Sequence, residues 1–358
     1  MKTIKEFTLI VLLFSTTILL AAPSEPVLVS MSAAYWDVPK DAVFESFDGR
    51  ETLKLNGKAF LREVSFKDGS ISVDVYANTK RSFAGILFRK KDNSMEEVYM
   101  RMHKSSQVDA VQYSPTFRGE LTWQLYREHQ ARVSLKNAGW NTLRIDIKGD
   151  AASVYVNDEL AMEVSDLRTD HKEGAIGLFA LFGNRFSNFQ YQAKGYHPEE
   201  KNKVLQYAEG LISEWSISGA KMYNDDTGLK DFAKDSFTKV VTEQSGLLAF
   251  SKFLDKPSSG EFEKNQEACV LARVSVFSEE KRYARLAVDF SDKILLFVNG
   301  NPVFRGDNAF RTKGVQYMGH LSLDANHLYI PLEKGENVIE CLVIDRANGW
   351  GLMAKWLD

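Results

Sequence analysis

Several residue types are scarce in this sequence, and each scarcity excludes a class of protein. Only 2 of the 358 residues are cysteine, which excludes a scaffold held together by many disulfides. Proline is scarce too, at 8 residues, and no collagen-like or low-complexity tract is present. An excess of one charge is also lacking, because 45 Lys and Arg stand against 48 Asp and Glu, a net charge of −3. Nucleic acids and anionic bilayers are bound through clustered positive charge, so we expect neither as a partner.

Common catalytic motifs are also missing. The sequence has no Gly-x-Ser-x-Gly elbow, no Walker loop and no His-Glu-x-x-His, and its six histidines are scattered. Cys269 and Cys341 each lie in an apolar, strand-like run and not in a Cys-x-x-Cys pair. They are either a disulfide or two buried thiols. We expect no cofactor, with a structural calcium ion as the alternative, because carboxylate and amide oxygens suit that ion.

A long apolar run lies near the N-terminus. The run from Phe7 to Leu20 follows Lys2 and Lys5 and is shorter than the roughly 20 residues of a membrane span. Small residues follow it, which is typical of a secretory signal peptide with a cleavage site near Ala22. We therefore expect a signal peptide over 1–22 and a secreted or periplasmic protein without a membrane partner after cleavage. A retained anchor is the alternative.

The rest of the chain has a globular composition, with 44% hydrophobic and 26% charged residues. At roughly 100 to 200 residues per domain, its length predicts two domains. Apolar and polar residues alternate with a period of two in short runs from about Val43 to Tyr191, which indicates half-buried antiparallel strands. The clearest runs are 71–76, 98–103, 121–126 and 143–148, with a hairpin over 152–160. This pattern predicts a β-sandwich over 23–195.

The pattern changes near Gly195. His197-Pro198-Glu199 is typical of a helix start, so we expect a short helical linker over 196–211. Strand-like runs return in the second half, over 268–277, 283–290, 293–298 and 337–345. The segment 229–242 suits either a short helix or a packed loop. The predicted fold class is all-β, with two jelly-roll β-sandwiches joined by the linker and the second one over 212–358.

Two strand-like runs carry the candidate ligand-binding residues. Alternation places the apolar residues of 98–103 and 121–126 on one side, which leaves aromatic and planar polar groups on the other. Sugars are bound by such surfaces, through ring stacking and hydrogen bonds to hydroxyls. The candidates are Arg89, Tyr99, Arg101, His103, Gln112, Gln124 and Tyr126. The alternative is an ordinary solvated sheet face. His103 is also a candidate general base, with a surface or binding role as its alternative.

The second half has weaker candidates on a connecting loop. They are Asn299, Arg305, Asn308 and Arg311. Loops at one end of a jelly roll commonly bind ligands. Asn, Asp and Gly are also the residues that turns require, so a purely structural role is the alternative.

The first half resembles a known family. The runs Ser82-Phe83-Ala84-Gly85-Ile86-Leu87-Phe88-Arg89, His103-Lys104-Ser105 and Trp123-Gln124-Leu125-Tyr126 are similar to those of concanavalin A-like lectin and glucanase domains. Within that group, residues 40–192 are most similar to laminin G-like and 3-keto-disaccharide hydrolase-like domains. The second half, through Leu295-Leu296-Phe297-Val298-Asn299-Gly300, is similar to galactose-binding-like jelly rolls.

The resemblance implies a carbohydrate-related protein, but one catalytic signature is missing. Glucanases of this fold carry a Glu-x-Asp-x-x-Glu strand whose carboxylates flank the glycosidic bond, and this sequence has none. We therefore predict an exported protein that binds an oligo- or polysaccharide, and we assign no catalytic residue. The alternatives are a glycoside hydrolase acting on a 3-keto sugar and an adhesion protein that binds another protein.

Overall fold

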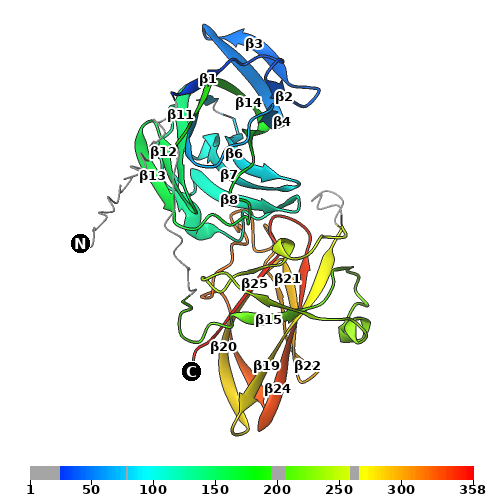
Figure 1. The fold of residues 1–358 in the computed structure, drawn as a ribbon. Coiled ribbons are helices and arrows are strands. Elements are labelled where there is room, and N and C mark those ends of the chain that lie inside the picture. The colour runs from blue at the N-terminus through cyan, green and yellow to red at the C-terminus, as the bar shows by residue number, and fades with distance from the viewer. Residues whose placement is uncertain (1–24, 78–79, 195–205, 259–265) are drawn as a thin grey trace, which may run out of the picture.

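The computed structural model describes residues 25–77, 80–194, 206–258 and 266–358. They form two β-sandwiches, which lie one above the other in Figure 1. The all-β class is confirmed, because the helical segments of the described residues are short 3-10 turns. These are η1 (Met102–Lys104), η2 (Arg127–His129), η3 (Leu229–Phe232) and η4 (Phe250–Lys252). The expected signal peptide and most of the expected helical linker lie outside the described residues.

The first sandwich contains the strands up to β14. They are β1 (Val27–Val29), β2 (Trp36–Asp37), β3 (Val43–Phe47), β4 (Arg50–Leu61), β5 (Gly69–Ala77), β6 (Phe83–Lys91), β7 (Ser94–Arg101), β8 (Val111–Phe117), β9 (Glu120–Leu121), β10 (Gln130–Ala131), β11 (Gly139–Lys148), β12 (Ala151–Val156), β13 (Glu159–Val164) and β14 (Ala175–Ala193). Their order is β10-β8-β7-β6-β14-β5-β11-β12-β13, and all of these pairs are antiparallel.

A single long strand joins the two layers of this sandwich. The first part of β14 pairs with β6, and its last part pairs with β5. Between them Phe182 and Gly183 have positive φ values of 67° and 74°, and the pairing with β4 shifts there. The two layers enclose one core, to which β7 contributes Val98 and Met100, while β11 contributes residues such as Ile145. Because side chains alternate along a strand, the other face of β6, β7 and β8 points away from this core.

Most strands expected in the first half are present, but one prediction is wrong. The runs 71–76 and 143–148 lie within β5 and β11, and the 152–160 hairpin turns at Asn157 and Asp158, both with positive φ. The run 121–126 is not a strand, because β9 ends at Leu121 and the chain then turns. The 98–103 strand also ends early, at Arg101, where η1 begins.

The second sandwich contains the remaining strands. They are β15 (Glu214–Ile217), β16 (Lys221–Met222), β17 (Thr238–Val241), β18 (Leu248–Ala249), β19 (Ala268–Ser278), β20 (Arg282–Ser291), β21 (Lys293–Val298), β22 (Asn301–Asp307), β23 (His327–Leu332), β24 (Gly335–Asp345) and β25 (Gly351–Trp356). One sheet has the order β17-β15-β19-β24-β21-β22, with β16 paired to β19, and the other has β18-β25-β20-β23. The four strands expected over 268–345 are all present.

The structure of the second sandwich settles the conformation of the segment 229–242 and the state of the two cysteines, which the sequence left open. The segment 229–242 is η3 followed by a loop and β17, and Phe232 of η3 packs on the outer face of the larger sheet. Cys269 lies in that outer cluster, whereas Cys341 lies in the core between the sheets. Opposite faces of a sheet cannot be bridged, and both cysteines are buried free thiols.

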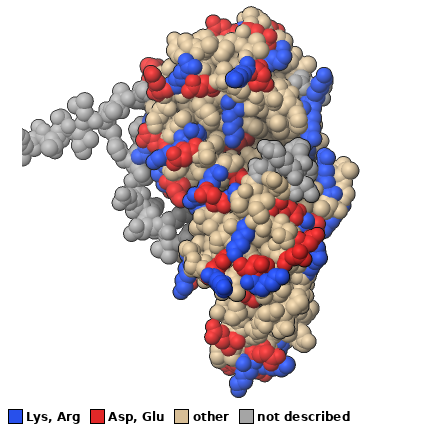
Figure 2. Space-filling model, turned by 90° about the vertical axis from the view of Figure 1, so that its right-hand side faces the viewer, with Lys and Arg blue, Asp and Glu red and all other residues tan. Residues whose placement is uncertain are grey.

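The two sandwiches share an apolar cluster. Phe117, Leu125 and Tyr126 of the first sandwich pack with Leu247, Ala249 and Leu321 of the second, and all six are buried. Ion pairs border it, including Arg118 with Asp255 at 3.1 Å and Glu120 with Lys256 at 3.5 Å. On the face of the molecule in Figure 2, side chains of both charges are interspersed over both sandwiches. In the part of the chain that the structure describes, no helix is long and apolar enough to cross a membrane.

Candidate functional site

The strand register places one row of side chains across six strands of the first sandwich. Directly paired residues of antiparallel strands point to the same face, so the pairings can be followed from strand to strand. The row runs through Lys58, Phe179, Gly85, Tyr99, Gln112 and Gln130. It lies on the face opposite the core. We call these residues and their neighbours on that face the sheet-face site.

A hydrogen-bond network occupies the middle of the sheet-face site. The side-chain oxygen of Gln112 accepts hydrogen bonds from Tyr99 Oη at 3.0 Å, from Gln130 Nε2 at 3.2 Å and from the guanidinium of Arg101. Arg101 also donates to Tyr99 Oη at 3.2 Å. Tyr99, Arg101 and Gln112 are buried, so this network holds planar polar groups in fixed positions away from bulk water.

A buried carboxylate balances the charge of Arg101. Asp109 Oδ2 lies 3.3 Å from Arg101 Nη1 and also accepts a hydrogen bond from Lys104. Burial acts to raise the pKa of Asp109, but the hydrogen bond from Lys104 and the charges of Arg101 and Lys104 together outweigh it and hold the pKa below its ordinary value. Asp109 is therefore ionised at neutral pH, and it positions Arg101 against Tyr99 and Gln112.

Aromatic rings border the network towards β14. The Tyr99 ring lies 6.1 Å from Phe179 and from Phe83, and Phe83 lies 6.2 Å from Phe182. Phe83 and Phe179 are partly exposed, and Phe182 is 56% exposed although it is a large apolar residue. Gly85 lies between these rings, where an added Cβ would be 2.6 Å from the Tyr99 Cβ. The close approach of Tyr99 to the β6 backbone therefore requires glycine at this position.

Glu97 lies one step further along β7 on the same face. It pairs with Leu87 on one side and with Ser114 on the other, and its side chain is buried. Burial raises the pKa of Glu97 to about 7, and the charge of Lys58 partly opposes that shift. At neutral pH the carboxyl group thus exchanges its proton readily, which is the property of a general acid or base.

His103 lies in η1 at the edge of the site, half-buried, with its ring 5.2 Å from Phe83. Its Nδ1 lies 3.3 Å from the Ser82 carbonyl oxygen, which accepts a hydrogen bond from Nδ1–H. Burial lowers the pKa of His103, so the ring is neutral at pH 7. No carboxylate in the described ranges forms an ion pair with it, and its expected role as a general base stays a prediction.

Gln124 and Tyr126 are not part of the sheet-face site, contrary to the expectation from alternation. The 121–126 segment turns after β9 and crosses β8, where Trp123 O accepts a hydrogen bond of 2.7 Å from Gln112 Nε2. Gln124 Nε2 then donates to Met318 O at 2.8 Å in the second sandwich. Tyr126 packs in the cluster between the sandwiches. Thr122, Gln124 and Tyr126 are buried, whereas Leu121 is exposed and Trp123 is partly exposed, so the alternation does not separate an apolar buried side from a polar exposed side.

Arg89 is a further correction. It lies at the end of β6, where the register with β7 shifts and Arg89 has a φ of 52°. Its buried guanidinium donates to Gly149 O and lies 3.8 Å from Asp68. Arg89 therefore joins loops of the first sandwich and does not reach the sheet-face site.

The four candidates of the second half do not converge. Asn299 lies at the turn between β21 and β22 and exchanges hydrogen bonds with Asn337 and Val338. Asn308 is buried at the other end of that hairpin, where it donates to Asp289 and accepts from Lys313. Arg305 and Arg311 are exposed, and Arg311 lies over the Phe310 ring at 4.8 Å. Asn299 and Asn308 thus have the structural roles that were the alternative.

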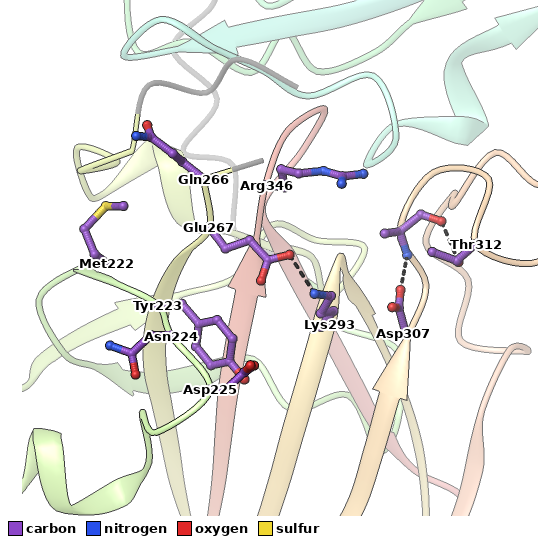
Figure 3. A pocket seen from close by; sticks show the side chains of 11 residues that line it. Met222, Tyr223, Asn224, Asp225, Gln266, Glu267, Lys293, Asp307, Thr312 and Arg346 are labelled. Carbon is purple, nitrogen blue, oxygen red and sulfur yellow. Dashed lines mark hydrogen bonds and ion pairs between the residues drawn. The ribbon is translucent and has the colours of Figure 1, made fainter. Parts of the chain in front are cut away.

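A cavity of about 590 Å³ opens at one end of the larger sheet of the second sandwich. Strand β21 begins at this edge and its antiparallel neighbour β22 ends there, so Lys293 of β21 lies beside Asp307 of β22. Figure 3 shows Glu267 and Lys293 directed towards each other, and their ion pair measures 2.6 Å. Tyr223, Asp225 and Arg346 also line the cavity. Its walls mix acids and bases and carry no cluster of one charge.

Within the described ranges, no three His, Cys, Asp or Glu side chains are placed to hold a metal ion. A structural calcium ion, the alternative from composition, stays a prediction.

The fold and the site define an all-β protein of two sandwiches, the first of which carries a sheet face of interleaved polar and aromatic groups. Residues 32–191 match the family model of the 3-keto-alpha-glucoside-1,2-lyase-like domain. The resemblance of the first half to 3-keto-disaccharide hydrolase-like domains is therefore confirmed. The match ends at Tyr191, before the second sandwich begins. No curated protein matches the chain.

Three solved structures that are similar to the chain each cover less than half of it. A carbohydrate-binding module from Bacillus subtilis is 14% identical and covers 44% of this chain and 94% of its own, with a TM-score of 0.33. A β-glucanase from Bacillus licheniformis is 10% identical over 49% of this chain and 94% of its own, with a TM-score of 0.31. A galectin from Caenorhabditis elegans is 13% identical over 43% and 97%, with a TM-score of 0.28.

Sequence reasoning found Tyr99, Arg101 and Gln112, which the structure brings together, and it missed other members of the site. Lys58 and Phe179 were missed because β4 and β14 are far from β7 in the sequence, and only the sheet order makes them neighbours. Glu97 was not among the candidates from the sequence. The signal that identifies it is its place two residues before Tyr99 on the same strand face.

Proposed function

We propose that the protein binds carbohydrate on the sheet-face site of the first sandwich, with an α-glucoside or its 3-keto derivative as the ligand class. The observation that carries this proposal is the row of side chains from Lys58 to Gln130 with its aromatic border. The matched family is described by its action on 3-keto-α-glucosides, which supports this ligand class.

The geometry suits a sugar ring. The partly exposed rings of Phe83 and Phe179 offer stacking surfaces for the C–H faces that sugar rings present. Lys58 is partly exposed at one end of the row and provides a hydrogen-bond donor for hydroxyl or carbonyl oxygens. The buried Tyr99 ring packs beside Phe83 and Phe179, so these two rings need little ordering when a ligand binds.

Affinity measurements with matched variants test the binding proposal. Isothermal titration of the full chain with maltose and 3-keto-maltose should show binding of at least one of them. Phe179→Ala should weaken it about fivefold, because a stacked ring contributes roughly 1 kcal/mol. Phe277→Ala is the matched control, since Phe277 is 75% exposed on β19 of the second sandwich. Equal affinities of the wild type and Phe179→Ala would place the ligand elsewhere.

Glu97 favours a second candidate function, cleavage of the 3-keto sugar. The C2 proton of such a glycoside is acidic because C2 is adjacent to the C3 carbonyl. In a 1,2-elimination, Glu97 takes this proton and the C1–O bond breaks, which leaves a C1–C2 double bond in the sugar. The departing oxygen takes up a proton from the Glu97 carboxyl group or from water and leaves as an alcohol. A carboxylate with a pKa of about 7 is suited to this proton transfer.

Product analysis separates binding from cleavage. Incubation of the wild type with 3-keto-maltose should release glucose if Glu97 acts as the base, and Glu97→Gln should abolish the release while retaining affinity. Binding of 3-keto-maltose without release of glucose would contradict cleavage and support only the binding function.

A further inference from the structure

The sheet-face site does not end within the first sandwich. Gln130 closes the row on β10, and its Nε2 is shared between Gln112 Oε1 at 3.2 Å and His320 Nε2 at 3.3 Å. His320 belongs to the loop between β22 and β23 of the second sandwich. The last polar group of the row therefore comes from the other sandwich.

This loop is held in place on the first sandwich by backbone contacts. Gln124 Nε2 donates to the carbonyl oxygens of Met318 and Gly319, at 2.8 and 3.2 Å, and Leu321 N donates back to Gln124 O at 3.2 Å. Gly319 has a φ of 69°, and a Cβ there would lie 2.3 Å from Gln124 Nε2. Glycine thus permits the contact, and the loop has a defined position beside the row.

Aromatic groups from both sandwiches meet at the same point. The Trp123 ring lies 5.7 Å from Phe310 and 5.6 Å from His320, both edge-on, and all three residues are partly exposed. Because His320 Nε2 accepts from Gln130, its Nδ1 carries the proton, and no group in the described ranges accepts it. Burial lowers the pKa of His320 to about 4, so the ring stays neutral at pH 7. An aromatic surface beside a free N–H donor matches the needs of one sugar residue.

We propose that Trp123, Phe310 and His320 form a second subsite at this end of the row, so that the protein takes an oligosaccharide and the second sandwich sets the preferred chain length. This rests on the proposed carbohydrate binding. The row from Lys58 to Gln130 spans five strand spacings, roughly 24 Å at about 4.8 Å each, which is much longer than a single sugar ring. The centre of the row at Tyr99 and Gln112 is buried, so a glycan that contacts both partly exposed ends passes over this centre to reach His320.

A chain-length series tests the shared site in the full protein. The probes are maltose, maltotriose and maltopentaose with their 3-keto derivatives, each titrated against wild type, His320→Ala and Phe310→Ala. The wild type should bind the pentasaccharide about tenfold more tightly than the disaccharide. His320→Ala and Phe310→Ala should each reduce this gain to about twofold, with a smaller effect on the disaccharide affinity than on the pentasaccharide affinity. A general loss of structure would lower both affinities equally.

Two further variants complete the design. His327→Ala removes an exposed histidine of β23 in the same sandwich and should keep the tenfold gain. His320→Gln retains an acceptor for Gln130 and a donor for the ligand, and should restore most of the gain.

Three outcomes overturn the inference. If the gain persists in both His320→Ala and Phe310→Ala, or if wild-type affinity does not depend on chain length, the shared subsite is wrong while the proposed binding function stands. If the wild type binds no member of the series, the proposed function and the shared subsite both fail.

Discussion

Tyr126 Oη donates a hydrogen bond of 2.7 Å to Glu243 Oε1, across the boundary between the two sandwiches. Arg168 of the first sandwich completes the contact, because its Nε lies 3.4 Å from Glu243 Oε2 and its guanidinium lies over the Tyr126 ring. Tyr126 is fully buried. The alternation of residues 121–126 predicted that Tyr126 lies on a ligand surface, but Tyr126 instead joins the two sandwiches through the buried carboxylate of Glu243.

Replacing Tyr126 by Phe should lower stability without changing ligand affinity. The substitution keeps the ring but removes the donor to Glu243, and a buried carboxylate that loses a hydrogen bond costs about 1 to 3 kcal/mol. Urea unfolding of the full chain measures the loss. Tyr329→Phe is the control, since Tyr329 is 71% exposed on β23. A reduced sugar affinity with unchanged stability would restore Tyr126 to the ligand site.

The buried Glu97 should make stability depend on pH. Burial raises the pKa of this group from 4.5 to about 7 in the folded protein, so the folded state binds the proton more tightly than the unfolded state. The raised pKa therefore adds its full contribution to the free energy of unfolding below about pH 4.5. This contribution, up to roughly 3 kcal/mol, is lost as the pH rises towards 7.

Comparison with Glu97→Gln isolates this contribution. The variant cannot ionise, so its free energy of unfolding minus that of the wild type should increase between pH 4.5 and 7 and then level off. Urea unfolding at several pH values measures the difference. A constant difference over this range would mean that Glu97 titrates at its ordinary pKa.

Each sandwich should fold alone, at a cost in stability. Fragments 23–195 and 205–358 each retain a core between their own sheets, but separation exposes the shared cluster of Leu125, Tyr126 and Leu321. We expect a cooperative thermal transition for each fragment, at a lower midpoint than in the full chain. If either fragment lacks such a transition, the two sandwiches form one folding unit.

The two cysteines should be unreactive in the native protein. Burial raises the pKa of Cys269 to about 12, and Cys341 is buried in the core, so neither forms a thiolate at neutral pH. Thiol titration without reductant should give no reaction in the folded state and two thiols per chain in denaturant. Fewer than two reactive thiols per chain in denaturant would indicate a disulfide.

The sequence by itself determined the local structure of most of the chain. Period-two alternation identified β5, β11 and the β12–β13 hairpin, because a strand with one buried face must alternate and the Asn157-Asp158 turn permits positive φ. It also placed Tyr99 and Arg101 on the face away from the core. These properties depend on neighbours along the chain, so the chain alone specifies them.

Only the tertiary structure decided what covers that face and which residues meet on it. Gln124 and Tyr126 alternate like strand residues, yet β9 ends before them and the second sandwich buries both. Lys58 and Phe179 join the row of Tyr99 because β14 pairs with β6, the neighbour of β7, and β4 pairs with β14. His320 reaches Gln130 only because the two sandwiches pack together. Alternation along the chain indicates which side of a strand is apolar. Whether the other side is also buried depends on contacts between residues that are far apart in the sequence.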